Sequence, residues 1–137
     1  MEPNTNTNTN QKTILVAEDE VDLREALVTA LTGEGFRVLP AADGAEALKL
    51  ALAEHPDLIM LDLHMPNLDG HGVLKGLRQD DWGKTVYVIV LTAFSDVENM
   101  SNTVMEGGVN MEYLVKTDWR LDGVVSKIKE KLGVPTQ

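Results

Sequence analysis

Short apolar runs alternate with longer amphipathic segments along most of the chain. The runs are almost free of polar side chains and cover residues 13–17, 36–39, 58–61, 86–91 and, more briefly, 113–115. Continuous apolar runs of this length are typical of strands that are covered on both faces. The pattern therefore predicts five buried strands.

The segments between these runs carry apolar residues at the spacing of one helix face. The predicted stripes are Leu23, Ala26, Leu27, Ala30 and Leu31 in the first segment, Ala45, Leu48 and Leu52 in the second, and Leu121, Val124, Val125, Ile128 and Leu132 in the last. Gly33 and Gly35 are expected to end the first helix, and Pro56 prevents the second from continuing.

Strands and helices in alternation predict an α/β fold with five of each. Right-handed crossovers place such strands in an open parallel sheet with helices on both faces. A chain of 137 residues has the size of one domain. We assign the domain to residues 12–133, between a polar tail over 1–11, which is mostly Asn and Thr and is predicted to be disordered, and a short tail over 134–137.

Charge and composition exclude several classes of function. Twelve basic and 22 acidic residues give a net charge of −10, which argues against direct binding of nucleic acid or of anionic lipid and favours a cation or a basic partner. The absence of cysteine excludes disulfides, thiol catalysis and Cys-based zinc sites. Because no apolar run is long enough to span a membrane or to act as a signal region, we predict a cytoplasmic protein.

Polar side chains follow four of the predicted strands. Glu18 and Asp19 follow the first strand, Asp62 the third, Thr92 the fourth and Lys116 the fifth. The carboxyl ends of parallel strands meet at one edge of a sheet, where ligands bind. Clustered carboxylates favour a cation, and hard oxygen ligands select Mg²⁺. One carboxylate could then attack a phosphoryl group while the hydroxyl and the ammonium hold its oxygens, so the expected product is an aspartyl phosphate.

The stretch 61–70, Leu-Asp-Leu-His-Met-Pro-Asn-Leu-Asp-Gly, resembles the phosphoacceptor loop D-x-x-M-P-x-x-D-G of the CheY-like receiver domains of two-component response regulators. The similarity covers the chain from about Thr13 to Leu132, and Thr92 lies 30 positions after Asp62, as its counterpart does in that family. The resemblance implies a flavodoxin-like (βα)5 fold with strand order 2-1-3-4-5.

The same resemblance assigns roles to individual residues. It implies that Asp62 is the phosphoacceptor and that Lys116 pairs with the phosphoryl group. It also implies that Asp19, Asp62 and the backbone carbonyl of His64 bind Mg²⁺ directly, whereas Glu18 acts through a coordinated water molecule. Glu18 replaces the more usual Asp of the family's acidic pair, which lengthens the side chain and keeps its charge.

Two further residues match the family's switch. Thr92 is expected to move toward the phosphoryl group, and Tyr113 matches an aromatic residue that turns inward on activation. An ordinary half-buried strand aromatic is the alternative interpretation of Tyr113.

Thr117 stands where the family usually has Pro after the lysine. Because a cis bond to a residue other than Pro costs about 2.5 to 4 kcal/mol, we predict a trans bond between Lys116 and Thr117.

The resemblance implies a phosphoacceptor signalling domain that catalyses only its own phosphorylation and dephosphorylation. It would take its phosphoryl group from a sensor histidine kinase or a phosphotransfer protein, and switch the surface formed by the fourth helix, the fifth strand and the fifth helix. Since about five residues follow Leu132, we expect output through a downstream protein target, by a monomer or a phosphorylation-dependent homodimer.

Three other functions share parts of this pattern. A flavodoxin-like nucleotide or flavin binder would need a small phosphate-binding loop after the first strand, where the acidic stretch 18–20 would repel phosphate. A phosphatase of the haloacid dehalogenase type would need a D-x-D motif, and His64 occupies its third position. A receiver-like interaction module that works without phosphorylation remains open.

Overall fold

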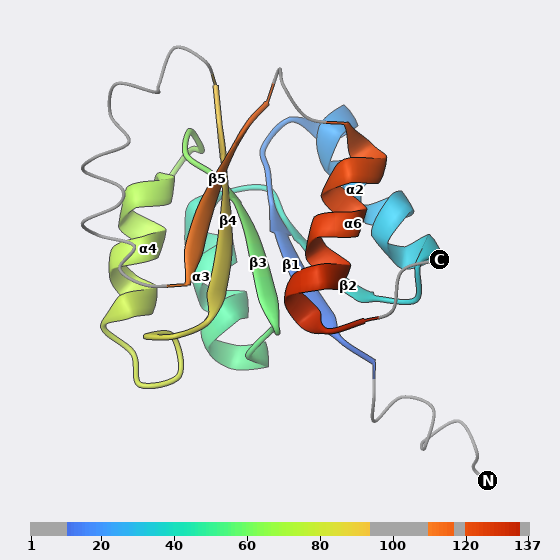
Figure 1. The fold of residues 1–137 in the computed structure, drawn as a ribbon. Coiled ribbons are helices and arrows are strands. Elements are labelled where there is room, and N and C mark those ends of the chain that lie inside the picture. Colours follow the sequence, from blue (N-terminus) through green and yellow to red (C-terminus); the bar gives the residue numbers. More distant parts are fainter. Residues whose placement is uncertain (1–10, 94–109, 117–119, 135–137) are drawn as a thin grey trace, which may run out of the picture.

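The computed structural model describes residues 11–93, 110–116 and 120–134. Five parallel strands form one sheet in the order β2-β1-β3-β4-β5 (Figure 1), which confirms the order that the resemblance implied. The strands are β1 (Thr13–Ala17), β2 (Arg37–Ala41), β3 (Leu58–Asp62), β4 (Tyr87–Thr92) and β5 (Met111–Val115).

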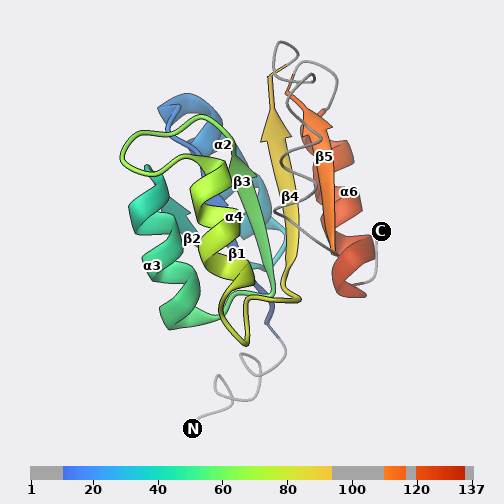
Figure 2. The ribbon, with the colours of Figure 1, turned by 90° about the vertical axis from the view of Figure 1, so that its left-hand side faces the viewer.

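Helices cover both faces of the sheet, as predicted. Those in the described residues are α2 (Val21–Gly33), α3 (Gly44–Glu54), α4 (Gly70–Arg78) and α6 (Leu121–Leu132). The helices α2 and α6 lie on one face, and α3 and α4 lie on the other, which is turned toward the viewer in Figure 2. The predicted helix between the fourth and fifth strands, most of the N-terminal tail and the bond between Lys116 and Thr117 lie outside the described residues. None of the described helices has the length and apolar character needed to cross a membrane.

The central strands β1, β3 and β4 are almost wholly apolar because they are covered on both faces. The prediction of five buried strands is wrong for the edge strands β2 and β5, which are only partly buried and carry Arg37 and Glu112. In β1, Leu15 and Ala17 belong to the core under α3 and α4, whereas Ile14 and Val16 belong to the core under α2 and α6. All four side chains are fully buried. Each large aliphatic side chain buried in this way contributes about 1.5 to 3 kcal/mol to folding. The two cores therefore hold the strand ends in a fixed register.

The second strand begins one residue later than predicted and extends two residues further. Phe36 precedes β2 and is buried in the core under α2 and α6. Pro40 lies inside β2, opposite Val16 of β1. A proline is compatible with this position because β2 is an edge strand, whose outer side has no neighbour to which a backbone N–H must donate.

The apolar stripe predicted for the second helix holds only at Leu48, which is partly buried against the core under α3 and α4. Ala45 and Leu52 are exposed, and the buried residues of α3 are Gly44, Ala47 and Ala51. Small residues face inward because α3 packs against both the sheet and α4, which leaves little space between the backbones. In α2, Leu27 and Leu31 are buried as predicted, but Ala26 is exposed.

Candidate functional site

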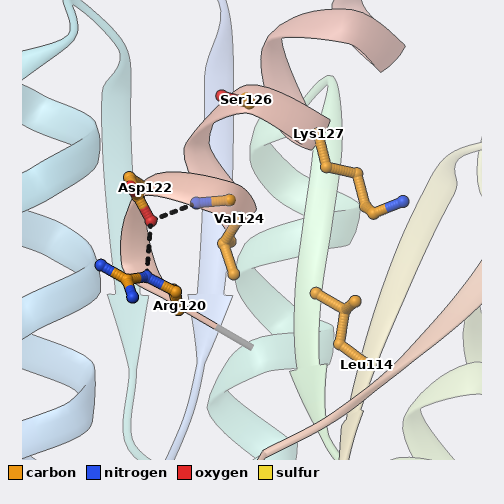
Figure 3. A pocket seen from close by; sticks show the side chains of 7 residues that line it. Leu114, Arg120, Asp122, Val124, Ser126 and Lys127 are labelled. Atoms are coloured by element: carbon orange, nitrogen blue, oxygen red, sulfur yellow. Dashed lines mark hydrogen bonds and ion pairs between the residues drawn. The ribbon is translucent and has the colours of Figure 1, made fainter. Parts of the chain in front are cut away.

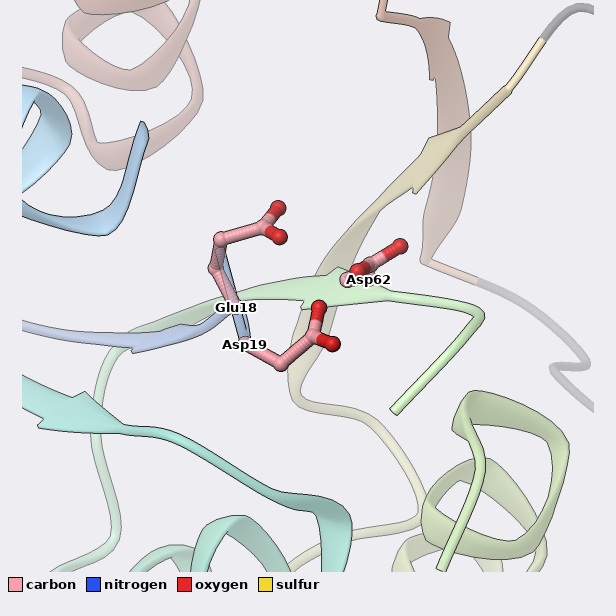
Figure 4. A group of neighbouring side chains, drawn as sticks. All are labelled: Glu18, Asp19 and Asp62. Carbon is pink, nitrogen blue, oxygen red and sulfur yellow. The ribbon is translucent and has the colours of Figure 1, made fainter. Parts of the chain in front are cut away.

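The ends of β1 and β3 bring three carboxylates together. Ala17 and Leu61 are partners in the sheet, so Glu18 and Asp62, which follow them, are neighbours across the edge. One carboxylate oxygen of each of Glu18, Asp19 and Asp62 lies within 4.8 Å of the others. Figure 4 shows the three side chains directed toward a common space at the carboxyl edge. The predicted acidic cluster is therefore present.

Lys116 lies between two of these carboxylates. Its Nζ is 3.1 Å from Oε1 of Glu18 and 3.2 Å from Oδ2 of Asp62. The backbone N–H of Lys116 donates to the carbonyl of Thr92 at 2.8 Å, which continues the pairing of β4 and β5 by one residue. The sheet thus brings the side chain to the acidic edge, as the order of strand ends predicted.

Burial shifts the pKa values of the ionisable groups in this cluster. Glu18 is fully buried and Asp62 is 3% exposed. Burial, together with repulsion from Asp62, raises the pKa of Glu18 to about 7, although the backbone N–H of Glu20 and the charge of Lys116 oppose the change. Burial also raises the pKa of Asp62, against the attraction of Lys116. Burial lowers the pKa of Lys116, but the attraction of Asp62 and Glu18 outweighs it and leaves that pKa raised.

The donor set of this site fits a hard divalent cation. Oε2 of Glu18 accepts a hydrogen bond from the backbone N–H of Glu20 at 3.1 Å. Oε1 is buried and accepts no hydrogen bond from the described residues, although the ammonium of Lys116 lies nearby. Oε1 of Glu18 therefore lacks a hydrogen bond within the described part of the chain and lies beside two further carboxylates. Carboxylate oxygens of this kind are the ligands that Mg²⁺ prefers.

Arg24 supports the acidic edge, and the sequence reasoning did not single it out. One of its guanidinium NH groups donates to the backbone carbonyl of Glu18 at 2.8 Å. The backbone N–H of Glu18 donates to the carbonyl of Ala41 in β2 at 3.0 Å. The backbone at Glu18 is therefore held from both sides. The sequence feature that could have indicated this role is the position of a basic residue one helical turn after Glu20, at the start of α2.

The structure places His64 beside the acidic cluster through its backbone. Its N–H donates to Oδ1 of Asp62 at 3.3 Å, whereas its side chain is exposed. The hydrogen bond fixes the start of the loop after β3 relative to the Asp62 carboxylate. The role of the His64 carbonyl as a metal ligand stays a prediction.

Thr92 ends β4, and Tyr113 lies in the middle of the neighbouring strand β5. Thr92 is fully buried, and its hydroxyl donates to the carbonyl of Ala93 at 3.2 Å. Tyr113 pairs with Val90 of β4 and packs, half-buried, against the core under α3 and α4. This position suits both a switching aromatic and ordinary strand packing, so the role of Tyr113 also stays a prediction.

A separate cavity of about 440 Å³ lies beside β5 and α6. Figure 3 shows its lining, in which Asp122 pairs with Arg120 at 3.6 Å and accepts a hydrogen bond from the backbone N–H of Gly123 at 2.9 Å. The other lining residues are Leu114, Val124, Ser126 and Lys127. No residue of the acidic cluster lines this cavity, so it is not part of the carboxylate site.

The fold and the site define a flavodoxin-like α/β domain with an acidic, lysine-containing site at the carboxyl edge of its sheet. Residues 14–128 match the family described as the response regulator receiver domain. The chain belongs to this family, whose members are phosphoacceptor signalling domains of two-component systems. The family match confirms the resemblance that the sequence motif indicated.

Curated relatives are longer than this chain. It is 44% identical over 107 residues to the probable transcriptional regulator ycf27 of Cyanophora paradoxa, which covers 78% of this chain and 43% of the relative. It is 40% identical over 119 residues to the transcriptional regulatory protein PrrA of Mycobacterium tuberculosis, which covers 87% of this chain and 49% of the relative. The chain thus spans about half the length of these relatives.

Solved structures of receiver domains share this fold. A CheY-like response regulator receiver domain protein from Methanospirillum hungatei has a TM-score of 0.80 and 25% identity, and the match covers 90% of this chain and 95% of that one. The receiver domain of a sensor histidine kinase from Pseudomonas aeruginosa has a TM-score of 0.79 and 28% identity, covering 90% and 98%. The latter structure has a magnesium ion coordinated in its active site cleft.

Proposed function

We propose that this chain accepts a phosphoryl group on Asp62 and acts as a phosphorylation-dependent switch in a phosphorelay. One observation carries the proposal: Asp62 is a buried carboxylate that contacts Lys116 and lies in one cluster with Glu18 and Asp19. The family to which the chain belongs supports the same function. We assign the receiver domain to residues 12–133.

The proposed reaction transfers the phosphoryl group from a phosphohistidine of a sensor histidine kinase or a phosphotransfer protein. A carboxylate oxygen of Asp62 attacks phosphorus and forms an O–P bond, which gives an acyl phosphate. The P–N bond breaks, its electron pair passes to the ring nitrogen, and the histidine ring, already protonated on its other nitrogen, leaves as neutral imidazole. Lys116 is placed to stabilise the phosphoryl oxygens, because its Nζ already lies 3.2 Å from Oδ2 of Asp62.

The acidic cluster would hold Mg²⁺ during this transfer. Asp19, Asp62 and the His64 carbonyl would be direct ligands, and Glu18 would act through a water molecule. When bound, the ion supplies positive charge near the phosphoryl oxygens. Asp19 is exposed, so it can reach the ion from the solvent side, whereas Glu18 completes the site from the buried side.

Thr92 and Tyr113 would convert phosphorylation into a change of surface. The Thr92 hydroxyl would exchange its hydrogen bond to the Ala93 carbonyl for one to a phosphoryl oxygen. That movement would make room for the Tyr113 ring to turn inward, which is a shift between two packings. We propose that a downstream protein, or a second copy of the chain, recognises the result on the surface that includes β5 and α6.

The longer relatives are named as transcriptional regulators, yet we propose protein partners for this region rather than nucleic acid. Its net charge of −10 would repel a phosphate backbone.

The alternative to a phosphorylation-dependent switch is an interaction module that works without phosphorylation. A cytoplasmic location fits all of these partners.

Mass spectrometry of the intact protein after incubation with acetyl phosphate and Mg²⁺ tests the proposal. The unmodified sequence should gain one phosphoryl group, and Asp62→Asn should gain none. Asp69→Asn is the matched control, because Asp69 caps α4 through the backbone N–H of Gly72 and Asn can serve as the same cap. Labelling of Asp62→Asn would contradict the assignment, and no labelling of the unmodified sequence would favour the interaction module.

A further inference from the structure

The loop after Asp62 is tied to a helix that carries none of the predicted site residues. The carboxylate of Asp43 accepts two hydrogen bonds, one on each oxygen. Oδ1 accepts from the backbone N–H of Glu46 at 2.8 Å and so caps α3. Oδ2 accepts from the side-chain amide of Asn67, in the loop between β3 and α4, at 3.0 Å. These donors hold the pKa of Asp43 below its usual range, so the carboxylate stays ionised.

Gly44 brings the same loop into direct contact with the backbone of α3. Its backbone N–H donates to the carbonyl of Pro66 at 3.4 Å. A Cβ atom at Gly44 would lie 1.6 Å from the carbonyl oxygen of Leu68, a distance that no side chain tolerates. The loop therefore rests on the first turn of α3 without any intervening side chain, and its position depends on that of the helix.

Backbone conformation and hydrogen bonds link this contact to the rest of the loop. Asn67 has a φ of 71°, in the left-handed region that Asn adopts more readily than most residues. The backbone N–H of Leu68 donates to the Pro66 carbonyl at 2.8 Å, and that of Gly70 donates to the Leu63 carbonyl at 2.8 Å. Because these bonds tie the residues that follow Asn67 to Pro66 and Leu63, which precede it, we expect a displacement at Asn67 to shift the backbone next to His64.

We propose that Asp43 and Asn67 are positioning residues that fix the loop carrying the His64 carbonyl, and thereby set the affinity for Mg²⁺ and the rate of phosphorylation at Asp62. The inference deepens the proposed function and rests on it. Neither residue touches the reacting atoms. Loss of a group that hydrogen-bonds directly to a metal ligand commonly weakens metal binding by about 10- to 100-fold. Asp43 and Asn67 act one step further from the ligands, so we expect a smaller effect.

A double-mutant cycle tests the hydrogen bond. Asn67→Gly removes the amide and keeps a residue that adopts positive φ, and Asp43→Ser keeps an oxygen that can cap α3 and loses the second acceptor. Each change should weaken the binding of Mg²⁺, measured by titration calorimetry, and slow labelling by acetyl phosphate by roughly 3- to 10-fold. The double variant should be no worse than either single variant, because both remove the same interaction.

Asn110→Gly is the matched control. Asn110 also has a positive φ of 61°, and its side-chain amide donates to a backbone carbonyl, that of Thr85, at 2.8 Å. It precedes β5, at the edge of the sheet opposite the carboxylates, so this variant should bind Mg²⁺ as the unmodified protein does. The exchanged pair, Asp43→Asn with Asn67→Asp, keeps one amide donor and one carboxylate acceptor at these two positions. It should therefore restore the Mg²⁺ affinity and the labelling rate toward those of the unmodified protein.

The outcomes separate this inference from the proposed function. Equal Mg²⁺ affinity and equal labelling in Asn67→Gly and Asn110→Gly would overturn the positioning role while leaving Asp62 as the phosphoacceptor. Additive losses in the double variant, or failure of the exchanged pair to recover, would overturn it as well. If the unmodified protein binds Mg²⁺ but is not labelled, the proposed function fails, and the calorimetric cycle still decides whether the two residues position the loop.

Discussion

The ammonium of Lys116 lies 3.1 Å from Oε1 of Glu18, and this contact joins residues 98 positions apart in the chain. It places a cation from the end of β5 beside a fully buried carboxylate at the end of β1. The Glu18 side chain is one methylene longer than the Asp usual at this position in the family. Lys116 therefore has two buried acceptors, Glu18 and Asp62, before any phosphoryl group arrives.

Removing the cation should destabilise the fold most at high pH. In Lys116→Met, two buried carboxylates lose their partner, and we expect the free energy of unfolding to fall by about 1 to 3 kcal/mol at pH 8 without Mg²⁺. The loss should be smaller at pH 5, where Glu18 is protonated. Urea unfolding at both pH values measures it. Lys84→Met, which removes an exposed pair with Asp81, should change little, and an equal loss in both variants would contradict the role of burial.

The stability of the protein should fall as the pH rises from about 4.5 to about 7. The folded pKa of Glu18, about 7, lies above its ordinary value of 4.5, so the folded state binds the proton more tightly than the unfolded state does. Glu18→Gln should remove up to about 3 kcal/mol of this pH dependence. Thermal or urea unfolding across the range measures it. The exposed Glu20→Gln is the control, and an unchanged pH profile in Glu18→Gln would contradict the raised pKa.

Mg²⁺ should stabilise the folded protein through Asp19. Binding to the folded state alone adds about 2.7 kcal/mol to the free energy of unfolding at a concentration 100 times Kd. Asp19→Asn should cancel most of this gain, and because Asp19 is exposed, the variant should fold as well as the unmodified protein without the ion. Melting curves with and without Mg²⁺ check this result, with Asp22→Asn as a control from the first turn of α2. A gain that survives in Asp19→Asn would place the ion elsewhere.

Thr92→Ala should separate phosphorylation from the change of surface. Asp62 should still be labelled, but the Tyr113 ring should no longer change its environment, because the hydroxyl that would follow the phosphoryl group is gone. NMR of the Tyr113 ring before and after labelling measures the coupling. Thr92→Ser retains a hydroxyl and should retain the response. An identical response of the Tyr113 ring in Thr92→Ala and in the unmodified protein would contradict the proposed coupling between Thr92 and Tyr113.

Gly44→Ala should be strongly destabilising, by about 2 to 4 kcal/mol, because its Cβ would overlap the Leu68 carbonyl. Gly123→Ala is a control of the same chemistry with the opposite expected sign. Gly123 lies in α6, where a Cβ atom would meet no described atom within 4 Å beyond its own helix, and it should gain about 0.5 to 1 kcal/mol from the higher helix propensity of Ala. Denaturant unfolding compares the two, and a stable Gly44→Ala protein would contradict the close contact.

Much of this protein followed from its sequence alone. Continuous apolar runs identified the strands most clearly in the centre of the sheet, which is buried on both faces. Polar residues after those runs identified the acidic edge, because parallel strands end together. The motif around Asp62 identified the family. These features are local in the chain, or depend only on the order of its strands.

Tertiary structure decided which side chains meet. The bridge from Lys116 to Glu18, the bond from Arg24 to the Glu18 carbonyl and the contact between Asp43 and Asn67 join separate elements. Such contacts depend on strand register and on how closely helices approach, and no spacing within one segment encodes them. The burial that raises the pKa of Glu18 has the same origin, since the whole fold must close over the end of β1 before that carboxylate loses its water.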